Sequence, residues 1–328
     1  MDVVSDAIAA VRVGRPSTNR LRVAGSWSTR LAPYEGAGFH VVLEGSCRLL
    51  IEDGAPVLLR TGDAVLLPHG TGHVLMDADR DPADGATAVP FERLMDGSVP
   101  RPPRTGPGGA ELLCGKYRVD RSRTHPLLAE LPPVVHLPNR VGRHPELRSA
   151  IELLGGELLG RRPGAELAVP SLLDLLLVYL VRAWLAEDGA GAWSAVLGDP
   201  VTDAALRALH ADPAADWTND RLAAVAGVSR PTLARRFTAL VGRPPMAYLT
   251  WWRLTFAATL LRDTTDPLAA IAQRVGYGTP YAFSHAFARE FGTTPGRYRA
   301  RGAGAGSEPG AGREGAQKWV AIPKTRRS

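Results

Sequence analysis

Four side chains in the N-terminal half of the chain could bind a soft metal ion or respond to an oxidant: His40, Cys47, His73 and Cys114. The two cysteines are too few for the disulfide framework of a secreted protein. Thiolates bind metal ions and form disulfides on oxidation, whereas free cysteines are also common fillers of apolar cores. An oxidant sensor and a packing role therefore both stay open for the two thiols.

Other patterns of catalytic residues are absent from the sequence. It contains no G-x-S-x-G, no phosphate-binding G-x4-G-K-[ST], no C-x-x-C and no H-E-x-x-H. His125, His136 and His144 stand close to prolines in predicted loops, and we expect them at the surface. We therefore predict no catalytic residues and no cofactor.

The clearest secondary-structure signals lie in the C-terminal third of the sequence, where one sequence pattern occurs twice. The copies begin at Leu222, with LAAVAGVSRPTLARRF, and at Ile271, with IAQRVGYGTPYAFSHAF. They share their small and apolar residues and differ in their polar ones. A repeat with this spacing predicts two helix-turn-helix units, at about residues 218–241 and 267–291.

Shared residues of the two copies have structural roles. Gly227 and Gly276 fall at the turn, where a positive φ is cheap only for glycine. Ser229 and Thr279 are predicted N-caps of each second helix. The residues that differ then face outward, and the stretch YLTWWRLTFAATLLRD between the units predicts one continuous helix.

Charge agrees with a nucleic-acid partner. The 328-residue chain has a net charge of +6 and a pI near 9.7. Twelve arginines oppose seven carboxylates between residues 200 and 300, and arginine suits both phosphates and guanine edges. The apolar run from Leu172 to Leu185 is too short to span a bilayer and no signal peptide is evident. We therefore expect a cytoplasmic protein without a membrane partner.

Residues from about Trp217 to Arg299 closely resemble the DNA-binding domain of the AraC/XylS family of bacterial transcription regulators. The matching words are WTNDRLAAVAGVSRPTLARRF, LTWWRLTFAATLLRD and the ending FAREFGTTPGRYR. The resemblance implies promoter DNA and RNA polymerase as partners. By position it implies base reading by Arg230, Pro231, Ala234 and Arg235 in the first unit, and by Tyr281, Ser284 and His285 in the second. Arg289 shares the outward face of the second unit.

The N-terminal half is typical of a β-barrel. FHVVLEGSCRLLIEDGAPVLLRTGDAVLLPHGTGHVLM predicts four short strands in succession. Its segment from Gly62 to His73 is similar to the second cupin motif, G-D-x4-P-x-G-x-x-H. The resemblance implies that His73 would be one ligand in a metal-dependent cupin. The preceding H-x-H pair is missing, and only Glu35 and His40 stand in its place, so we predict no metal.

Together these features predict an α+β protein with a cupin-like sensor barrel at residues 1–125 and a helical linker at 126–198. An all-α DNA-binding domain follows at 199–300, and a disordered tail at 301–328. Within the linker, helices are predicted from ELRSAIELLGGELL and from the Pro170-Ser171 start signal, and they offer a homodimer contact. The expected effector is an unidentified small molecule or oxidant. The alternative is a metal-dependent cupin enzyme with an appended DNA-binding domain.

Overall fold

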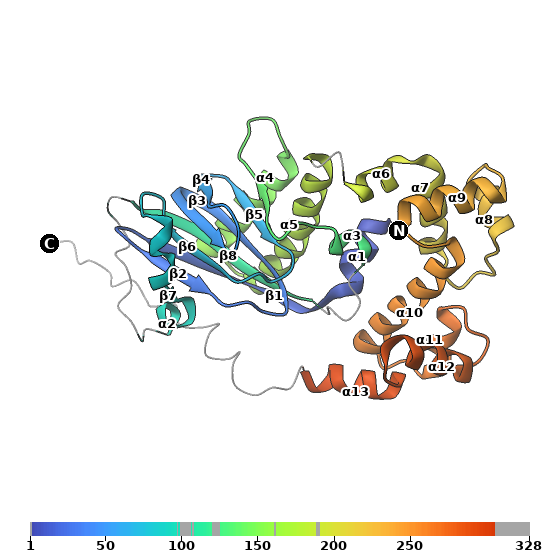
Figure 1. The fold of residues 1–328 in the computed structure, drawn as a ribbon. Coiled ribbons are helices and arrows are strands. Elements are labelled where there is room, and N and C mark those ends of the chain that lie inside the picture. The colour runs from blue at the N-terminus through green and yellow to red at the C-terminus, as the bar shows by residue number, and fades with distance from the viewer. Residues whose placement is uncertain are drawn as a thin grey trace.

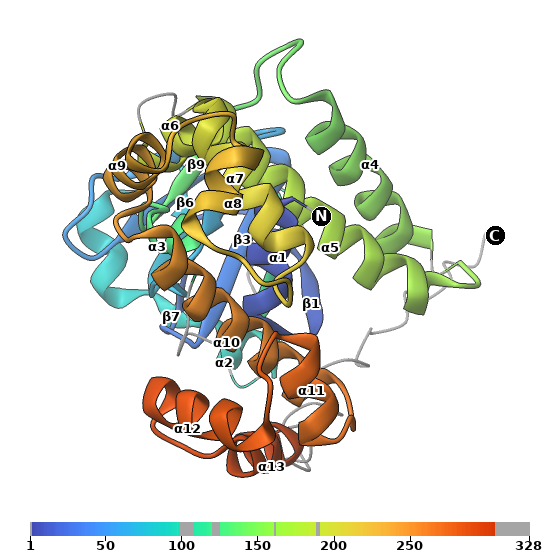
Figure 2. The ribbon, with the colours of Figure 1, turned by 90° about the vertical axis from the view of Figure 1, so that its right-hand side faces the viewer.

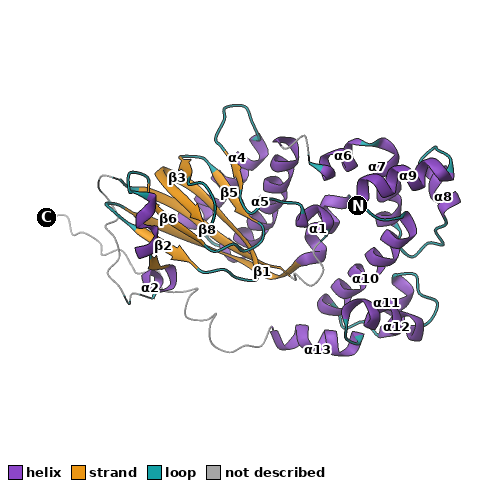
Figure 3. Ribbon diagram, in the orientation of Figure 1, coloured by secondary structure: helices purple, strands orange, loops and turns teal. Residues whose placement is uncertain are grey.

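The computed structural model describes residues 2–96, 98, 106, 108–119, 125–160, 162–187 and 191–305. A curled sheet lies at one end of the molecule and a group of helices at the other (Figure 1). Figure 3 shows this separation of strands from helices directly. The predicted α+β class, with a half-barrel N-terminal domain and an all-helical C-terminal region, is confirmed.

In the part of the chain that the structure describes, nine strands form the half-barrel. Their main path runs β1-β8-β3-β6-β2-β7, with β4 and β5 also paired to β3, and β9 paired to β5. All of these pairs are antiparallel except the short β2–β7 pair. The bounds are β1 (Arg12–Val23), β2 (Ser28–Leu31), β3 (Gly36–Ile51), β4 (Val57–Arg60), β5 (Ala64–Leu67), β6 (His73–Asp77), β7 (Val89–Pro90), β8 (Ala110–Val119) and β9 (Val135–Leu137).

The long strand β3 organises two separate apolar layers. Successive side chains on a strand point to opposite faces, so β3 serves both layers. Phe39 and Val41 belong to a cluster on the outer face of the sheet, whereas Val42, Cys47 and Leu49 belong to the cluster inside the half-barrel. The four strands predicted between residues 39 and 76 are present as β3 to β6.

Two long helices, α4 (Pro145–Gly160) and α5 (Ala165–Glu187), form a hairpin that contributes to the outer-face cluster. The predicted start of the second helix at Pro170 is wrong, because α5 begins five residues earlier and Pro170 lies inside it. Proline removes one backbone hydrogen bond in a helix interior. Buried residues from Leu173 to Trp184 hold the rest of α5 in place.

The sheet extends beyond the predicted boundary at residue 125. Strand β9 lies within the range expected to be linker, yet it pairs with β5 and completes that edge. A short helix, α6 (Ala192–Gly198), closes the range predicted as a helical linker. The shorter elements of this half are α1 (Val3–Val11), η1 (Pro82–Thr87), α2 (Phe91–Met95) and α3 (Pro126–Ala129). Residues 301–305 of the predicted tail belong to helix α13 (Pro295–Ala305), so the expectation of disorder is wrong there, and residues 306–328 lie outside the described residues.

Within the described residues, α5 alone is long and apolar enough to cross a membrane by length and composition. Core helices of soluble proteins pass the same test. Seven of its side chains are buried against the rest of the molecule, and Asp174 and Arg182 interrupt its apolar sequence. The packing of α5 against the sheet is the role that the structure shows.

The C-terminal region holds seven helices within the described residues, and its predicted connecting helix is confirmed as α10. Their bounds are α7 (Pro200–Ala211), α8 (Asn219–Val225), α9 (Arg230–Val241), α10 (Pro245–Asp263), α11 (Leu268–Arg274), α12 (Pro280–Phe291) and α13 (Pro295–Ala305). Leu233 and Phe237 of α9 belong to the large cluster that continues into the N-terminal half. Phe283 and Phe287 of α12 belong to a separate cluster. The two copies of the repeat therefore have different cores.

Candidate nucleic-acid interface

The first helix-turn-helix is formed by α8 and α9. Ser229 caps α9 by accepting a hydrogen bond from the backbone N–H of Thr232, as the sequence predicts. Gly227 sits in the turn with a φ of 66°, and a Cβ placed there would meet nothing within 4 Å. Leu233 and Phe237 are fully buried on the inner face of α9. The outer face of α9 is consequently free to meet a partner.

The second helix-turn-helix, α11 and α12, repeats this design with a tighter turn. Thr279 caps α12 through the backbone N–H of Ala282. Gly276 has a φ of 79°, and a Cβ there would lie 2.8 Å from the guanidinium carbon of Arg253. Arg253 reaches in from α10 and donates to the carbonyl of Pro213 at 2.6 Å. Glycine at 276 thus allows both the turn and the close approach of α10.

Arginines on the outer face of α9 differ in what they contact. Arg230 lies 3.6 Å from Asp220, and Arg236 lies 3.4 Å from Asp199, each measured between the nearest nitrogen and oxygen. Arg235 is exposed and has no ion-pair partner in the described part of the chain. Pro231 is exposed beside it and Ala234 is half-buried. Arg235 is therefore the side chain of this face most available to a nucleic acid.

On α12 the predicted reading residues form a mixed outer face. Tyr281 is 81% exposed at the start of the helix, which is unusual for a large aromatic ring. His285 and Arg289 are exposed one and two turns further on, and Ser284 is half-buried. This face offers an aromatic ring, an imidazole and a guanidinium. All three can contact base edges or phosphates.

Helix α10 separates the two units. Its 19 residues span ~28 Å at the usual helical rise. Successive major grooves on one side of B-DNA lie ~34 Å apart. Figure 2 shows α9 near one end of α10 and α12 near the other. The length of α10 therefore suits two helices that enter neighbouring grooves.

His40 and His73 are buried inside the half-barrel and contact each other. Their Nε2 atoms lie 2.7 Å apart, and His73 Nδ1 donates to the carbonyl of Thr71 at 2.8 Å. In that tautomer His73 Nε2 accepts from His40 Nε2–H, which leaves His40 Nδ1 as a buried acceptor without a partner. Burial lowers the pKa of both rings, and the neighbouring His73 lowers the pKa of His40 further.

This histidine pair does not fit a metal site of the cupin kind. Two nitrogens that bind one zinc ion in a tetrahedron lie ~3.4 Å apart, because each is ~2.1 Å from the metal. The separation of 2.7 Å leaves no room for an ion between the two rings. No cluster of three or more His, Cys, Asp or Glu side chains that could hold a metal occurs among the described residues. The pair therefore gives the enzyme alternative no support.

The thiols of Cys47 and Cys114 are both buried in the cluster inside the half-barrel. Burial, together with the nearby Asp63, raises the pKa of Cys47 to about 12. The pKa of Cys114 is also raised, by burial and by the neighbouring Cys47. Oxidation and metal binding require the thiolate. These surroundings favour packing over a redox role, which remains a hypothesis.

The expectation for His125 is wrong, because it is fully buried, with its Nε2 atom 3.1 Å from the hydroxyl of Tyr248. It caps α3, where its Nδ1 accepts from the backbone N–H of Leu127. The sequence signal was the Pro126 that follows, since proline is common at the first position of a helix. His136 and His144 are half-buried and pair with Asp63 and Glu187, each at 3.1 Å.

Comparison with known families agrees with the two halves of the fold. A cupin family model matches residues 2–186, and a helix-turn-helix domain model matches residues 222–301. The first match covers more than half of the chain. The second contains both α9 and α12, with the helix that joins them.

Individual proteins resemble the chain over nearly its whole length. An AraC-like transcription regulator of Streptomyces antibioticus is 36% identical over 91% of this chain and 98% of its own. The transcriptional regulator MtrA of Neisseria gonorrhoeae is 30% identical over 92% of this chain and 99% of its own. Among solved structures, the DNA-binding domain of AdpA in complex with a target DNA is 32% identical. It covers 34% of this chain and 99% of its own, with a TM-score of 0.31.

Proposed function

The chain belongs to the AraC family of transcription regulators, and from this premise we propose that it binds promoter DNA with α9 and α12 in neighbouring major grooves. The observation that carries the proposal is the pair of capped helices, each with a buried inner face and a different outer face. Shared scaffolds with different outer faces suit two different sets of base pairs.

Reading roles follow from what each side chain can reach. Arg235 makes the main polar base contact of the first unit. Pro231 and Ala234 respond to the shape of the DNA and contact the methyl groups of thymine bases. Arg230 joins Arg235 in reading bases from the start of α9. In the second unit Tyr281, Ser284 and His285 face the bases. Arg289 lies two turns from the start of α12 and contacts the backbone. The regulator works in the cytoplasm, where it acts beside RNA polymerase. Run-off transcription from a bound promoter would measure its effect on the polymerase.

Selection from a random DNA pool with the full-length protein tests this proposal. We expect enrichment of a bipartite site whose halves are about one helical turn apart. Enrichment of one half-site alone would show that only one unit reads DNA. Absence of any enriched sequence would contradict the proposed function.

Arg235→Ala is expected to weaken binding to the selected site by ~1–3 kcal/mol and to relax base preference in one half only. The reason is loss of one bidentate contact to a base edge. Competition binding to sites with each half scrambled measures this. Arg236→Ala is the matched control, since it removes the same charge from a side chain that faces Asp199. Equal weakening on all sequences would assign Arg235 to a phosphate instead.

We also propose that two copies associate through the α4–α5 hairpin. Leucines on these helices are exposed, with Leu159 at 63% and Leu167 at 77%, and Leu153 and Leu175 exposed to a lesser degree. The hairpin lies away from α9 and α12, so its pairing leaves both reading helices accessible (Figure 2). Sedimentation of the full chain should give a dimer mass, and Leu159→Glu with Leu167→Glu should give the monomer. A wild-type monomer would contradict this contact.

A further inference from the structure

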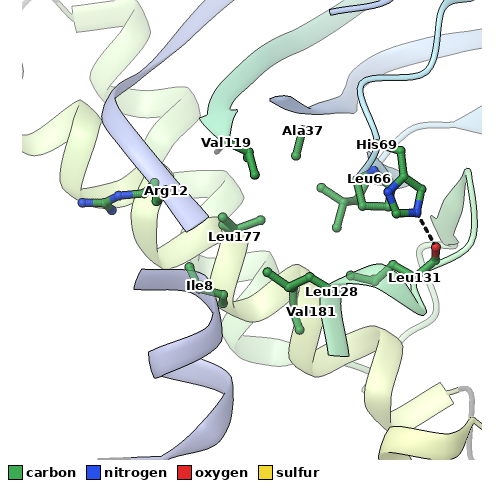
Figure 4. A pocket seen from close by; sticks show the side chains of 11 residues that line it. Ile8, Arg12, Ala37, Leu66, His69, Val119, Leu128, Leu131, Leu177 and Val181 are labelled. Carbon is green, nitrogen blue, oxygen red and sulfur yellow. Dashed lines mark hydrogen bonds between the residues drawn. The ribbon is translucent and has the colours of Figure 1, made fainter. Parts of the chain in front are cut away.

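A narrow pocket lies outside the half-barrel, between the outer face of the sheet and helices α1, α3 and α5 (Figure 4). It is thus separate from the interior positions of His40, His73 and the two cysteines. Ala37 and Leu66 form its floor on the sheet, and Leu177 and Val181 come from α5. Ile8 of α1 and Leu128 of α3 close it from the side of the DNA-binding region.

The lining is almost entirely hydrocarbon. Two polar side chains border the pocket, Arg12 and His69, and both are engaged. Arg12 forms an ion pair with Asp174, and its guanidinium points away from the pocket (Figure 4). His69 Nε2 donates to the carbonyl of Leu131 at 2.6 Å. The lining therefore offers no unpaired charged side chain to an ionic ligand. Burial of an ionic ligand there would be costly, because its charge would stay unpaired.

We propose that this pocket binds a small neutral hydrophobic molecule and that its occupancy is passed to the DNA-reading helices through α1 and α3. The binding step stands on the lining alone. The second step rests on the proposed function, because it requires that α9 and α12 bind DNA.

The link from pocket to reading helices is a buried chain of four polar side chains. Asp6 of α1 contacts His210 Nδ1 of α7 at 2.9 Å. His210 Nε2 lies 2.8 Å from the hydroxyl of Tyr248 on α10. The same hydroxyl lies 3.1 Å from Nε2 of His125, the cap of α3. The hydroxyl of Tyr248 therefore links the two pocket walls, α3 directly through His125 and α1 through His210.

One arrangement of protons satisfies the whole chain. His125 Nδ1 accepts from Leu127, so its Nε2–H donates to the oxygen of Tyr248. The hydroxyl of Tyr248 then donates to His210 Nε2, and His210 Nδ1–H donates to Asp6. All four residues are buried, and a buried donor left without a partner is costly. These hydrogen bonds thus fix the positions of α1 and α3 relative to α10.

A second contact ties α1 to α10 further along. Arg262 of α10 donates to the carbonyl of Ala10 at 2.8 Å. Ile8 lies between Asp6 and Ala10 on the same short helix, which Figure 1 shows between the sheet and the helical region. A ligand that displaces Ile8 or Leu128 must shift Asp6 or His125 against Tyr248. It then changes the balance between two placements of α10 by its differential affinity for them.

Binding is tested first without DNA, on the full chain, with toluene and cyclohexanol as neutral probes and benzoate as the charged control. We expect the neutral probes to raise the melting temperature and to give saturable heats of binding, and benzoate to do neither. Leu128→Trp, which fills the pocket, should remove both effects. Val181→Phe fills it from α5 instead of α3 and guards against a misfolded first variant. Equal binding of benzoate, or unchanged binding by both filled variants, would overturn the site.

Coupling is tested by the ratio of DNA affinities with and without saturating toluene, on the selected operator. We expect at least a fivefold change in the wild type and less than a twofold change in Tyr248→Phe, with toluene still bound by the variant. Tyr34→Phe, which removes a hydroxyl without a hydrogen-bond partner in the described residues, should behave as the wild type. A toluene-binding protein whose DNA affinity never changes would overturn the coupling. A protein that selects no DNA sequence would instead fail the proposed function and leave the binding result intact.

Discussion

Phe287→Ala should abolish reading of one operator half while the other half stays bound. Phe287 is fully buried, with its ring centroid 4.2 Å from Phe291 and 5.4 Å from Tyr298. Truncation of a buried phenylalanine costs ~3–5 kcal/mol. The cluster around Phe287 is separate from the core of the first unit. We expect a loss of this size to unfold α11 and α12 while the first unit stays folded.

Footprinting on the selected operator measures the outcome. Protection should disappear from the half assigned to α12 and persist, at lower affinity, over the half assigned to α9. Phe287→Leu is the matched control, because it keeps most of the buried volume and should retain both halves. Simultaneous loss of both halves would show that the two units do not fold independently.

Acidification from pH 7.5 to 5.5 should lower the free energy of unfolding by up to ~4 kcal/mol. Burial lowers the pKa of His40, His73 and His125 below the ordinary value of 6.5, with that of His40 and His125 well below it. Nearby His73 acts in the same direction on His40, and His210 and Arg243 do so on His125. Each histidine contributes up to ~1.4 kcal/mol per pH unit.

The free energy of unfolding depends on pH because the unfolded chain and the folded protein bind different numbers of protons. Below pH 6.5 the unfolded chain binds protons on these three rings, while the folded protein keeps them neutral. Stability therefore rises with pH in this window, and is lost as pH falls from 6.5 toward the lowered folded values. Above pH 7.5 both states are neutral and the contribution is flat.

Urea unfolding at half-unit pH intervals measures this slope as a proton uptake. His125→Gln should reduce the slope by about one proton, whereas His285→Gln, on the exposed face of α12, should leave it unchanged. Stability that does not vary between pH 7.5 and 5.5 would show that the pKa values of the buried rings are not lowered in the folded protein.

The helix-turn-helix units could be predicted because their signals are local. A glycine at a turn, a hydroxyl at an N-cap and apolar residues at helical spacing each act within about ten residues. The repeat showed them twice, so Ser229 and Thr279 were identified together. The half-barrel strands were equally clear, because alternation of buried and exposed side chains is also local.

Long-range features were not predictable in this way. Asp6 and His210 are 204 positions apart in the sequence, and His125 and Tyr248 are 123 apart. Nothing in the local pattern marks them as partners, and a histidine next to a proline is typical of an exposed loop. Strand β9 was missed for a similar reason, since three residues beside prolines become a strand only when β5 offers them an edge.

The separate core of the second unit bears on how long the protein stays on its operator. The first unit shares its core with the N-terminal half, whereas α11 and α12 connect to the rest mainly through α10 and α13. When α12 leaves its groove, the first unit keeps it near at a local concentration in the millimolar range. Rebinding is then faster than escape. Residence time on the whole site thus exceeds what either half supports, and amide exchange in α11 and α12 should reveal local openings that α9 does not share.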